Sequence, residues 1–376
     1  MQKRSVGVAE ASGEVIEFRL GELFCGPGGI GRGAQDARVA VDGGPTFVVR
    51  HVWANDYDKA SCVTYSKNIE IPEDRVFPEP VDRFIERLPE LERIDALTFG
   101  FPCNDFSNIG EKKGLGGKFG PLYEYGAHAL DELRPDWFLA ENVSGLSNSN
   151  AGSAFEKILN RLRNAGGGYN LTVHLYRFEE YGVPQTRHRI VIVGIREDLG
   201  LVFRVPAPTH GPNNWVTAGQ AIGAHPPASS LHNSEETRQS ATVIKRLNKI
   251  KPGQNAWNAN LPTELQLNVK GARLSNIYRR LRKDAPAYTV TGSGGGGTHI
   301  YHWDEPRALT NRERARLQSF PDDHVFYGRK EEVRKQIGMA VPPRAAKVII
   351  EAVLKTFAGI EYPTVPAHWG EFSSDK

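Results

Sequence analysis

The chain has 376 residues, of which 39% are hydrophobic and 24% are charged, and its formal net charge is +3. This composition is ordinary for a globular protein and excludes a disordered or fibrous chain, while the length is enough for two or three domains. A net charge so close to zero does not by itself indicate a nucleic-acid partner.

Cysteine usage and hydrophobic patterning exclude further classes of protein. The cysteines lie at positions 25, 62 and 103, odd in number and without a C-x-x-C pair. We therefore expect neither a disulfide framework nor a metal site, and a reducing, intracellular setting fits best. The N-terminal segment lacks the apolar stretch of a signal peptide, and no run of about 18 apolar residues predicts a membrane span.

Strand and helix patterns alternate through the first half of the chain. Apolar segments typical of strands lie at 15–24, 46–55, 94–99, 135–140 and 190–195, and helical patterns lie at 58–68, 81–91 and 154–164. This alternation predicts an α/β fold with a doubly wound, Rossmann-like sheet. Residues 1–199 are predicted to form this first domain.

The character of the sequence changes near residue 200. From there to about 305 it is rich in Pro, Asn, Gly and His without sustained periodicity, which indicates a smaller, loop-rich domain. Helical patterns return at 311–319 and 343–357. We predict a second domain with its hinge at 200–329 and a return to the first domain at 330–376.

Basic residues gather in the second domain. The densest group comprises Lys270, Arg273, Arg279, Arg280, Arg282 and Lys283. Such a run is either the solvated face of an element or a surface that contacts phosphate, and the pattern leaves both readings open.

A glycine-rich turn follows the first predicted strand at 25–29. Glycines there let a ligand approach the backbone closely, although a plain strand-to-helix turn explains them equally well. The turn lacks the G-x-G-x-x-G spacing of a dinucleotide site. Asp56 ends the next strand, where an acid suits a ribose, and Tyr57 beside it suits an adenine face. Together these features predict an adenosine-containing ligand such as S-adenosylmethionine.

Chemically reactive side chains lie at other strand ends. Cys103 comes just after the strand at 94–99, where open α/β sheets place their active sites. Glu141 ends the following strand, and Arg187 and Arg189 open another with both side chains on one face. Each residue alone has a structural explanation, such as a buried inert thiol. Their joint position at one sheet edge predicts a reactive site.

A series of motifs runs through residues 17–358. They are LFCGPGG at 23–29, GFPCNDFS at 100–107, ENV at 141–143, QTRHR at 185–189, RALTNRERARLQSFPD at 307–322 and GMAVPP at 338–343. In type and order they resemble the DNA cytosine-5 methyltransferases, chiefly those of bacterial restriction–modification systems.

The resemblance implies the reaction and the catalytic residues. In the family, a methyl group passes from S-adenosylmethionine to C5 of a cytosine flipped out of a specific double-stranded DNA sequence. Cys103 matches the thiolate that adds to C6 of the base. Glu141 matches the carboxyl that holds N3, Arg189 contacts the base oxygen, and Arg187 lies nearby.

The resemblance also assigns binding residues. The positions that match cofactor contacts are Phe24, Gly26, Gly28, Gly29, Asp56, Tyr57, Asp82 and Pro102. The region at 200–305 matches the target-recognition domain. The DNA contacts expected there and in the loop after Cys103 are Ser107, Arg279, Arg280, Thr289, Thr291, Gly294, Gly295 and Gly296. The three glycines in this list would bring backbone groups to the base edges, and the two arginines would hold phosphates.

The sequence departs from the family pattern at three positions. Met339 stands where the family usually has Asn, and Phe119 stands where an Arg often occurs. Asp82 lies in PVDRF rather than in the usual G-D-[IV]. These departures affect a polar contact of the site, a phosphate contact and an adenine contact.

The family further implies double-stranded DNA as partner, a monomeric chain, and a cytoplasmic, nucleoid-associated location in a bacterium. A cognate restriction endonuclease would act on the same site without forming a stable complex. An RNA cytosine-5 methyltransferase is disfavoured because that lineage lacks so long a recognition insert. A catalytically inactive DNA-binding protein is disfavoured by the intact Cys103, Glu141 and Arg189. An oxidoreductase would follow from the glycine turn alone, but it would bind NAD and need no thiol.

Overall fold

The structure is a computed structural model that describes residues 13–101, 122–143, 152–224, 226–268, 275–369 and 371–372, the last two and 152–153 by their backbone alone. Several residues singled out above lie outside this part of the chain, namely Pro102, Cys103, Ser107, Phe119, Lys270 and Arg273. None of the helices in the described ranges has the length and hydropathy needed to cross a lipid bilayer.

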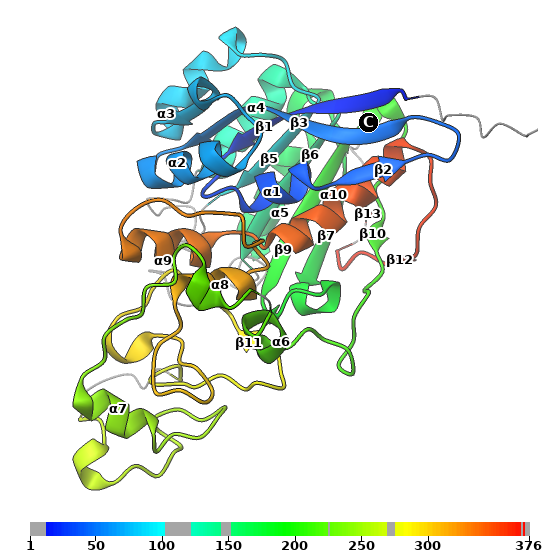
Figure 1. Ribbon diagram of the computed structural model, residues 1–376. Coiled ribbons are helices and arrows are strands. Elements are labelled where there is room, and N and C mark those ends of the chain that lie inside the picture. The colour runs from blue at the N-terminus through cyan, green and yellow to red at the C-terminus, as the bar shows by residue number, and fades with distance from the viewer. Residues whose placement is uncertain are drawn as a thin grey trace, which may run out of the picture.

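The elements follow the expected alternation and are labelled in Figure 1. The strands are β1 (Val15–Leu23), β2 (Arg38–Ala40), β3 (Thr46–Asp56), β4 (Val76–Pro78), β5 (Ala96–Gly100), β6 (Trp137–Val143), β7 (Tyr169–Arg177), β8 (Gln185–Thr186), β9 (His188–Arg196), β10 (Val205–Pro206), β11 (Ala287–Tyr288), β12 (Thr364–Val365) and β13 (Glu371–Phe372). The helices are α1 (Gly29–Gln35), α2 (Lys59–Asn68), α3 (Val81–Phe84), α4 (Tyr123–Leu133), α5 (Gly152–Arg163), α6 (Ala218–Ile222), α7 (Ala241–Leu247), α8 (Asn311–Leu317), α9 (Lys330–Met339) and α10 (Pro343–Phe357).

One large mixed sheet organises the first domain. Its strand order is β13-β7-β9-β6-β5-β1-β3-β2, and β4 adds to β3. The neighbours β6, β5, β1 and β3 are parallel, whereas β9 runs antiparallel to β6 and β7. The carboxyl ends of β1, β3, β5 and β6 therefore meet at one edge of the sheet, which is where ligands bind in such folds.

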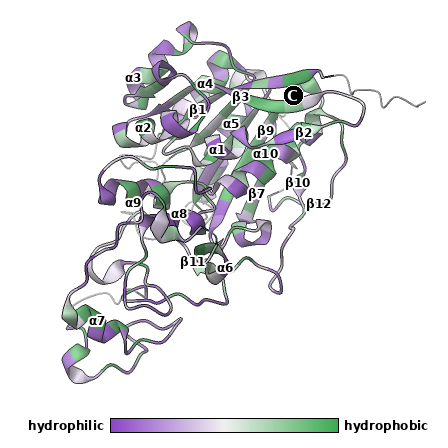
Figure 2. Cartoon of the chain, viewed as in Figure 1, coloured by the Kyte–Doolittle hydropathy of each residue, from purple (hydrophilic) through white to green (hydrophobic). Residues whose placement is uncertain are grey.

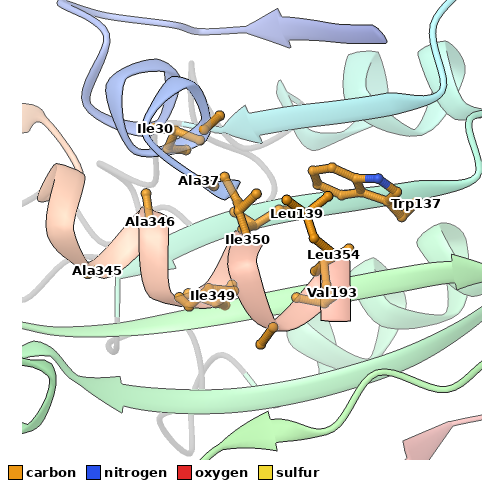
Figure 3. Packing of buried hydrophobic residues seen from close by; sticks show 14 of the residues in the cluster. Ile30, Ala37, Trp137, Leu139, Val193, Ala345, Ala346, Ile349, Ile350 and Leu354 are labelled. Atoms are coloured by element: carbon orange, nitrogen blue, oxygen red, sulfur yellow. The ribbon is translucent and has the colours of Figure 1, made fainter. Parts of the chain in front are cut away.

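Helices cover both faces of this sheet (Figure 1). On one face, Ile349 and Ile350 of α10 pack with Ile30 of α1 over Trp137 and Val193 of the sheet (Figure 3). On the other face, α4 and α5 cover a second buried cluster. Burying each large apolar side chain contributes about 1.5–3 kcal/mol, so these two layers fix the strand ends that carry the site.

Close packing of α1 against α10 sets the position of the glycine turn. A Cβ atom on Gly29 would lie 2.2 Å from the carbonyl oxygen of Val341, and one on Gly33 would lie 2.6 Å from Cβ of Ala346. Neither position leaves room for a side chain. The start of α1 is thereby held against the segment that leads into α10.

The second region, which is the predicted second domain at 200–329, lies below the sheet in the view of Figure 1 and consists of loops with short helices. Figure 2 shows its connecting segments to be mostly hydrophilic. It has its own buried cluster, which includes Leu281, Val290 and Ile300. Val333 and Ile337 of α9 belong to the same cluster. The domain boundaries after residues 199 and 329 stay predictions.

The predicted α/β class is confirmed, and most expected strands and helices lie within a few residues of their predicted ranges. The expected helix at 81–91 is instead the short α3 followed by a 3₁₀ turn over Ile85–Glu90, which contains Pro89. Proline lacks the N–H that would continue an α-helix. The sequence patterns did not predict β7 or α9.

Candidate active site

A cavity of about 360 Å³ lies at the carboxyl edge of the parallel strands. Its wall includes Phe24 after β1, Asp56 at the end of β3, Gly100 of β5 and Glu141 of β6. Cavities of this size hold small ligands and cofactors. The predicted cofactor acid and the predicted catalytic carboxyl thus line the same cavity.

Asp56 is fixed by backbone donors on two sides. Its Oδ2 accepts from the Gly26 N–H at 2.9 Å, and its Oδ1 accepts from the Asp58 N–H at 2.9 Å. Burial raises the pKa of Asp56, and these two hydrogen bonds oppose that rise. Each carboxylate oxygen keeps a lone pair, so the group can still accept hydrogen bonds from a ligand in the cavity.

The glycine turn brings Phe24 to the cavity. Phe24 has φ of +54°, in the left-handed region that bulky residues rarely adopt, at a cost of order 1–3 kcal/mol. Gly26 and Gly29 also line the cavity, whereas Gly28 caps α1 and is not part of the wall. Strain of this kind gathers at functional sites, so it supports a binding role for Phe24.

Two buried polar residues line the cavity that the sequence patterns did not single out. The Glu22 side chain accepts from the Tyr65 hydroxyl at 2.9 Å, and burial raises the pKa of Glu22 to about 8. The Asn55 amide donates to the carbonyls of Phe77 and Glu79, but its Oδ1 has no partner among the described residues. The position of both residues at strand ends beside the motifs was the signal that could have identified them.

The last wall of the cavity comes from α9. Lys335 donates to the Tyr57 hydroxyl at 3.3 Å, and its Nζ lies 5.7 Å from the centre of that ring. Met339 lines the cavity with 55% of its surface exposed, and Asp82 of α3 lines it as well. The departure at position 339 therefore places a thioether where the family pattern has an amide.

Glu141 and Arg189 form an ion pair at the reactive end. Arg189 Nε donates to Glu141 Oε1 at 2.8 Å, and both side chains are mostly buried. Burial lowers the pKa of Arg189, while the Glu141 carboxylate opposes that change. Gly100 pairs with Glu141 in the sheet. The chain therefore leaves β5 directly beside the carboxyl, three residues before Cys103.

Arg187 links the site to the second region. Its Nη1 donates to the Val290 carbonyl at 3.0 Å, whereas its Nε has no partner among the described residues. Burial lowers its pKa well below the usual range. Gln185 accepts from the Val290 N–H at 2.8 Å, and β8 pairs with β11. Arg187 lies between β8 and β9, so the expectation that it opens one strand together with Arg189 is corrected. With Gln185 of β8 it anchors the start of the glycine segment, residues 292–297.

The predicted DNA contacts divide into two groups. Gly294, Gly295 and Gly296 lie on a segment that is largely open, since nothing lies within 4 Å of a Cβ placed on Gly295 or Gly296. Thr289 instead donates its hydroxyl to the Thr186 carbonyl at 2.7 Å, and Thr291 bonds within its own turn. Gly295 and Gly296 face outward, Gly294 lies against Arg334 and His299, and the two threonines bond within the fold.

Arg280 does not fit a phosphate contact. It is 5% exposed, and its guanidinium donates to the carbonyls of Leu247, Ile250, His302 and Glu305. Its donors complete the core of the second region, so this expectation is corrected. The neighbouring Arg279 stacks on Tyr288, with 4.5 Å between its Cζ and the ring centre, and stays partly exposed.

Comparison with known proteins identifies a family for this chain. Residues 18–355 match the family model described as C-5 cytosine-specific DNA methylase. The chain is 57% identical over 359 residues to the Type II methyltransferase M.BbvI of Brevibacillus brevis, covering 94% of this chain and 95% of that protein. It is 40% identical to the Type II methyltransferase M.NgoFVII of Neisseria gonorrhoeae, covering 92% and 88%.

Solved structures are similar in fold. A methyltransferase of Entamoeba histolytica, EhMeth, matches with a TM-score of 0.61 at 14% identity, covering 91% of this chain and 99% of that one. At so low an identity the likeness concerns the fold alone. It agrees with the α/β fold described above.

Proposed function

Because the chain belongs to the family of C-5 cytosine-specific DNA methylases, we propose that its cavity holds S-adenosylmethionine at one end and the target cytosine at the other. The main support for this proposal is that Asp56 and Glu141 line the same cavity and that Arg189 is paired with Glu141. The enzyme is a DNA cytosine-5 methyltransferase, and an RNA substrate is the less supported alternative.

The residues present fit an adenosyl cofactor. Asp56 keeps free lone pairs for a ribose, and the buried Asn55 Oδ1 lacks a donor among the described residues. We assign the cofactor contacts to Phe24, Gly26, Gly29, Asp56, Tyr57 and Asp82, with Gly28 shaping the turn and Pro102 following from the resemblance. When bound, S-adenosylmethionine supplies the methyl group.

Asp56→Asn should weaken binding of S-adenosylmethionine by roughly 10- to 100-fold, because a hydrogen bond to a charged group contributes about 1.5–3 kcal/mol. Isothermal titration of the cofactor measures this. Asp36→Asn is the matched control, since Asp36 is an exposed acid that pairs with Arg32 away from the cavity. Equal affinities in the two variants would contradict the assignment of Asp56.

The protein's own groups can carry the base chemistry. Glu141 would hold and protonate N3 of the cytosine, while Arg189 orients the base through its oxygen and fixes the carboxylate. The thiolate of Cys103 then adds to C6, which makes C5 able to attack an electrophilic methyl group. Loss of the C5 proton breaks the bond from sulfur to C6 and restores the thiolate. Arg187 acts here by positioning the strand that carries Arg189.

Recognition of DNA is assigned to the glycine segment and its neighbours. Gly294, Gly295 and Gly296 would bring backbone groups to the base edges, and Arg279 is placed to contact phosphate. Thr289 and Thr291 would support the segment, and Ser107 stays a phosphate contact implied by the resemblance.

Gly295→Val tests this segment without disturbing the fold. Gly295 has extended backbone at φ −170°, and nothing lies within 4 Å of an added Cβ. We expect an unchanged melting temperature but a loss of preference for the cognate duplex over a scrambled one, by about 10-fold or more. Gly13→Val is a control glycine with equally open surroundings. A variant that keeps its full preference would move the recognition surface elsewhere.

Expression in a host without cytosine-5 methylation tests the function as a whole. Bisulfite sequencing should then find methylated cytosine in one short sequence context, and that context defines the cognate duplex. Purified protein should transfer labelled methyl groups to DNA and not to transfer RNA. Transfer to RNA alone would contradict the proposal.

We further propose that the chain acts as a monomer near the nucleoid. An endonuclease would cut the same DNA site without forming a stable complex with it.

A further inference from the structure

One buried arginine in α8 has two nitrogens without a hydrogen-bond partner in the part of the chain that the structure describes. Arg314 is 1% exposed, and its Nη1 and Nη2 have no partner among the described residues. Arg312, two positions earlier and 0% exposed, donates to the carbonyls of His232, Pro321 and His324. Arg316, the third buried arginine of α8, is likewise satisfied, by Asp322 and by the carbonyls of Ile222 and Ala224. Within the described part of the chain, the donors left over on this helix are thus those of Arg314.

The surroundings of Arg314 are positive. Arg334 of α9 interacts with it as a like charge and has a buried Nε without a partner among the described residues. Burial, with Arg334 nearby, lowers the pKa of Arg314 to about 10. Burial together with both arginines lowers the pKa of His299 to about 4. The neighbouring Glu313 favours the charged form of Arg314 electrostatically, but its carboxylate accepts two hydrogen bonds from Arg307 at 2.8 Å and leaves the Arg314 donors Nη1 and Nη2 without a partner among the described residues.

These groups lie beneath the glycine segment. A Cβ on Gly294 would lie 3.4 Å from Nε of Arg334 and 3.7 Å from Nδ1 of His299. Arg314 also interacts electrostatically with Tyr288, at the start of that segment. Arg334 and His299 thus lie against the part of the chain assigned to DNA, and Arg314 is near enough to both to interact with them electrostatically.

We propose that Arg314, Arg334 and His299 form an anion site that receives one backbone phosphate of the DNA duplex. The site combines two guanidiniums with an imidazole, and a phosphate brings both the charge and the acceptor oxygens that they lack. A base edge brings acceptors but no charge, which is why phosphate is the better match. The glycine segment must shift to admit it, and Gly295 and Gly296 have open space around them. This inference rests on DNA being the substrate.

Arg314→Met and Arg334→Gln test the site. Binding to the cognate and to a scrambled duplex is measured across a salt series. Each variant should weaken both complexes by roughly 10-fold, as expected for a lost charged hydrogen bond. Each should also flatten the plot of log affinity against log salt by about 0.9, the change for one phosphate contact. The double variant should lose little more than either single one, because both arginines hold the same phosphate.

Two controls separate this role from packing and from net charge. Arg312→Met should lower the melting temperature, because the carbonyls that accept from Arg312 are left without a donor. Arg314→Met should not lower it. Arg329→Gln removes one charge at the N-cap of α9, from a residue that is exposed and paired with Glu332, and the salt slope should stay unchanged.

Three results would overturn the site. An unchanged salt slope with lost cognate preference would mean that Arg314 reads a base edge. An unchanged slope and preference in both variants would mean that neither arginine meets DNA. A melting temperature that falls as in Arg312→Met would make Arg314 a packing residue. Absence of DNA binding by the unsubstituted chain would contradict the proposed function itself. Normal binding by that chain together with any of the three results above would remove only the site.

Discussion

Cys103→Ala should form no covalent adduct with DNA that carries 5-fluorocytosine in the cognate site, and its methyl transfer should fall to background. The unsubstituted chain should trap a stable adduct on the same DNA. Fluorine at C5 blocks the final loss of a proton, so the bond between sulfur and C6 cannot break. Denaturing gel electrophoresis and mass spectrometry of the adduct measure both results.

The described residues before Cys103 support this expectation. The Phe101 carbonyl accepts from the Asn142 amide at 3.3 Å, which fixes the chain two residues before the cysteine. A Cβ on Gly100 would lie 3.5 Å from Oε2 of Glu141. Three residues of extended chain span at most about 10–11 Å, so the chain length allows a thiol at position 103 to reach the Glu141 end of the cavity.

Cys62→Ala is the matched control for this experiment. Cys62 is a buried thiol beneath the cofactor end, and its Sγ donates to the Asp56 carbonyl at 3.4 Å. The control should keep the adduct. An adduct that persists in Cys103→Ala, or one mapped to Cys25 or Cys62, would show that another thiol is the nucleophile.

Glu141→Gln should lower the single-turnover rate by about 10²- to 10⁴-fold, the usual contribution of a general acid or base. The amide oxygen of Gln can still accept the hydrogen bond from Arg189 Nε, so the fold and cofactor binding should remain. What is lost is the proton and the negative charge beside N3 of the base. Rapid-quench measurement with enzyme in excess over DNA gives the rate of the chemical step.

Asp136→Asn provides the control for Glu141→Gln. Asp136 immediately precedes the same strand, β6, at its opposite end and pairs with Arg196 at 2.9 Å. The substitution therefore breaks a comparable ion pair far from the cavity, and the single-turnover rate should not change. If both variants lost rate equally, the effect would come from strand stability, and if neither did, Glu141 would have no role in proton transfer.

The convergence of Asp56 and Glu141 on one cavity could be predicted from the sequence. Both residues end apolar segments, and the rule that parallel strands meet at their carboxyl edge places them together. The same rule identified no residue of α9. Lys335 and Met339 reach the cavity from a polar helix late in the chain, whose position depends on packing of Val333 and Ile337 in the second region.

The errors have local physical causes. Arg280 lies in a run of basic residues, and nothing in that run shows which side chain turns inward. The distant carbonyls of Leu247 and His302 decide it. β7 was missed because it has no continuous apolar run: Asn170, Thr172 and His174 alternate with apolar residues, a pattern that indicates a half-buried strand. Thr172 and His174 are nevertheless buried, and the Thr172 hydroxyl donates to the Phe203 carbonyl at 2.7 Å.

The pairing of β8 with β11 limits which recognition segments can be transferred from one related enzyme to another. Ala287 pairs with Gln185, and Val290 is held from both its N–H and its carbonyl by Gln185 and Arg187. A graft that replaces residues 200–286 leaves these bonds with the recipient. A graft that continues to residue 292 replaces Val290, so that Gln185 and Arg187 must bind a residue from the donor enzyme instead. Compatibility with Gln185 and Arg187 then limits which specificities can be transplanted, whatever sequence the donor reads.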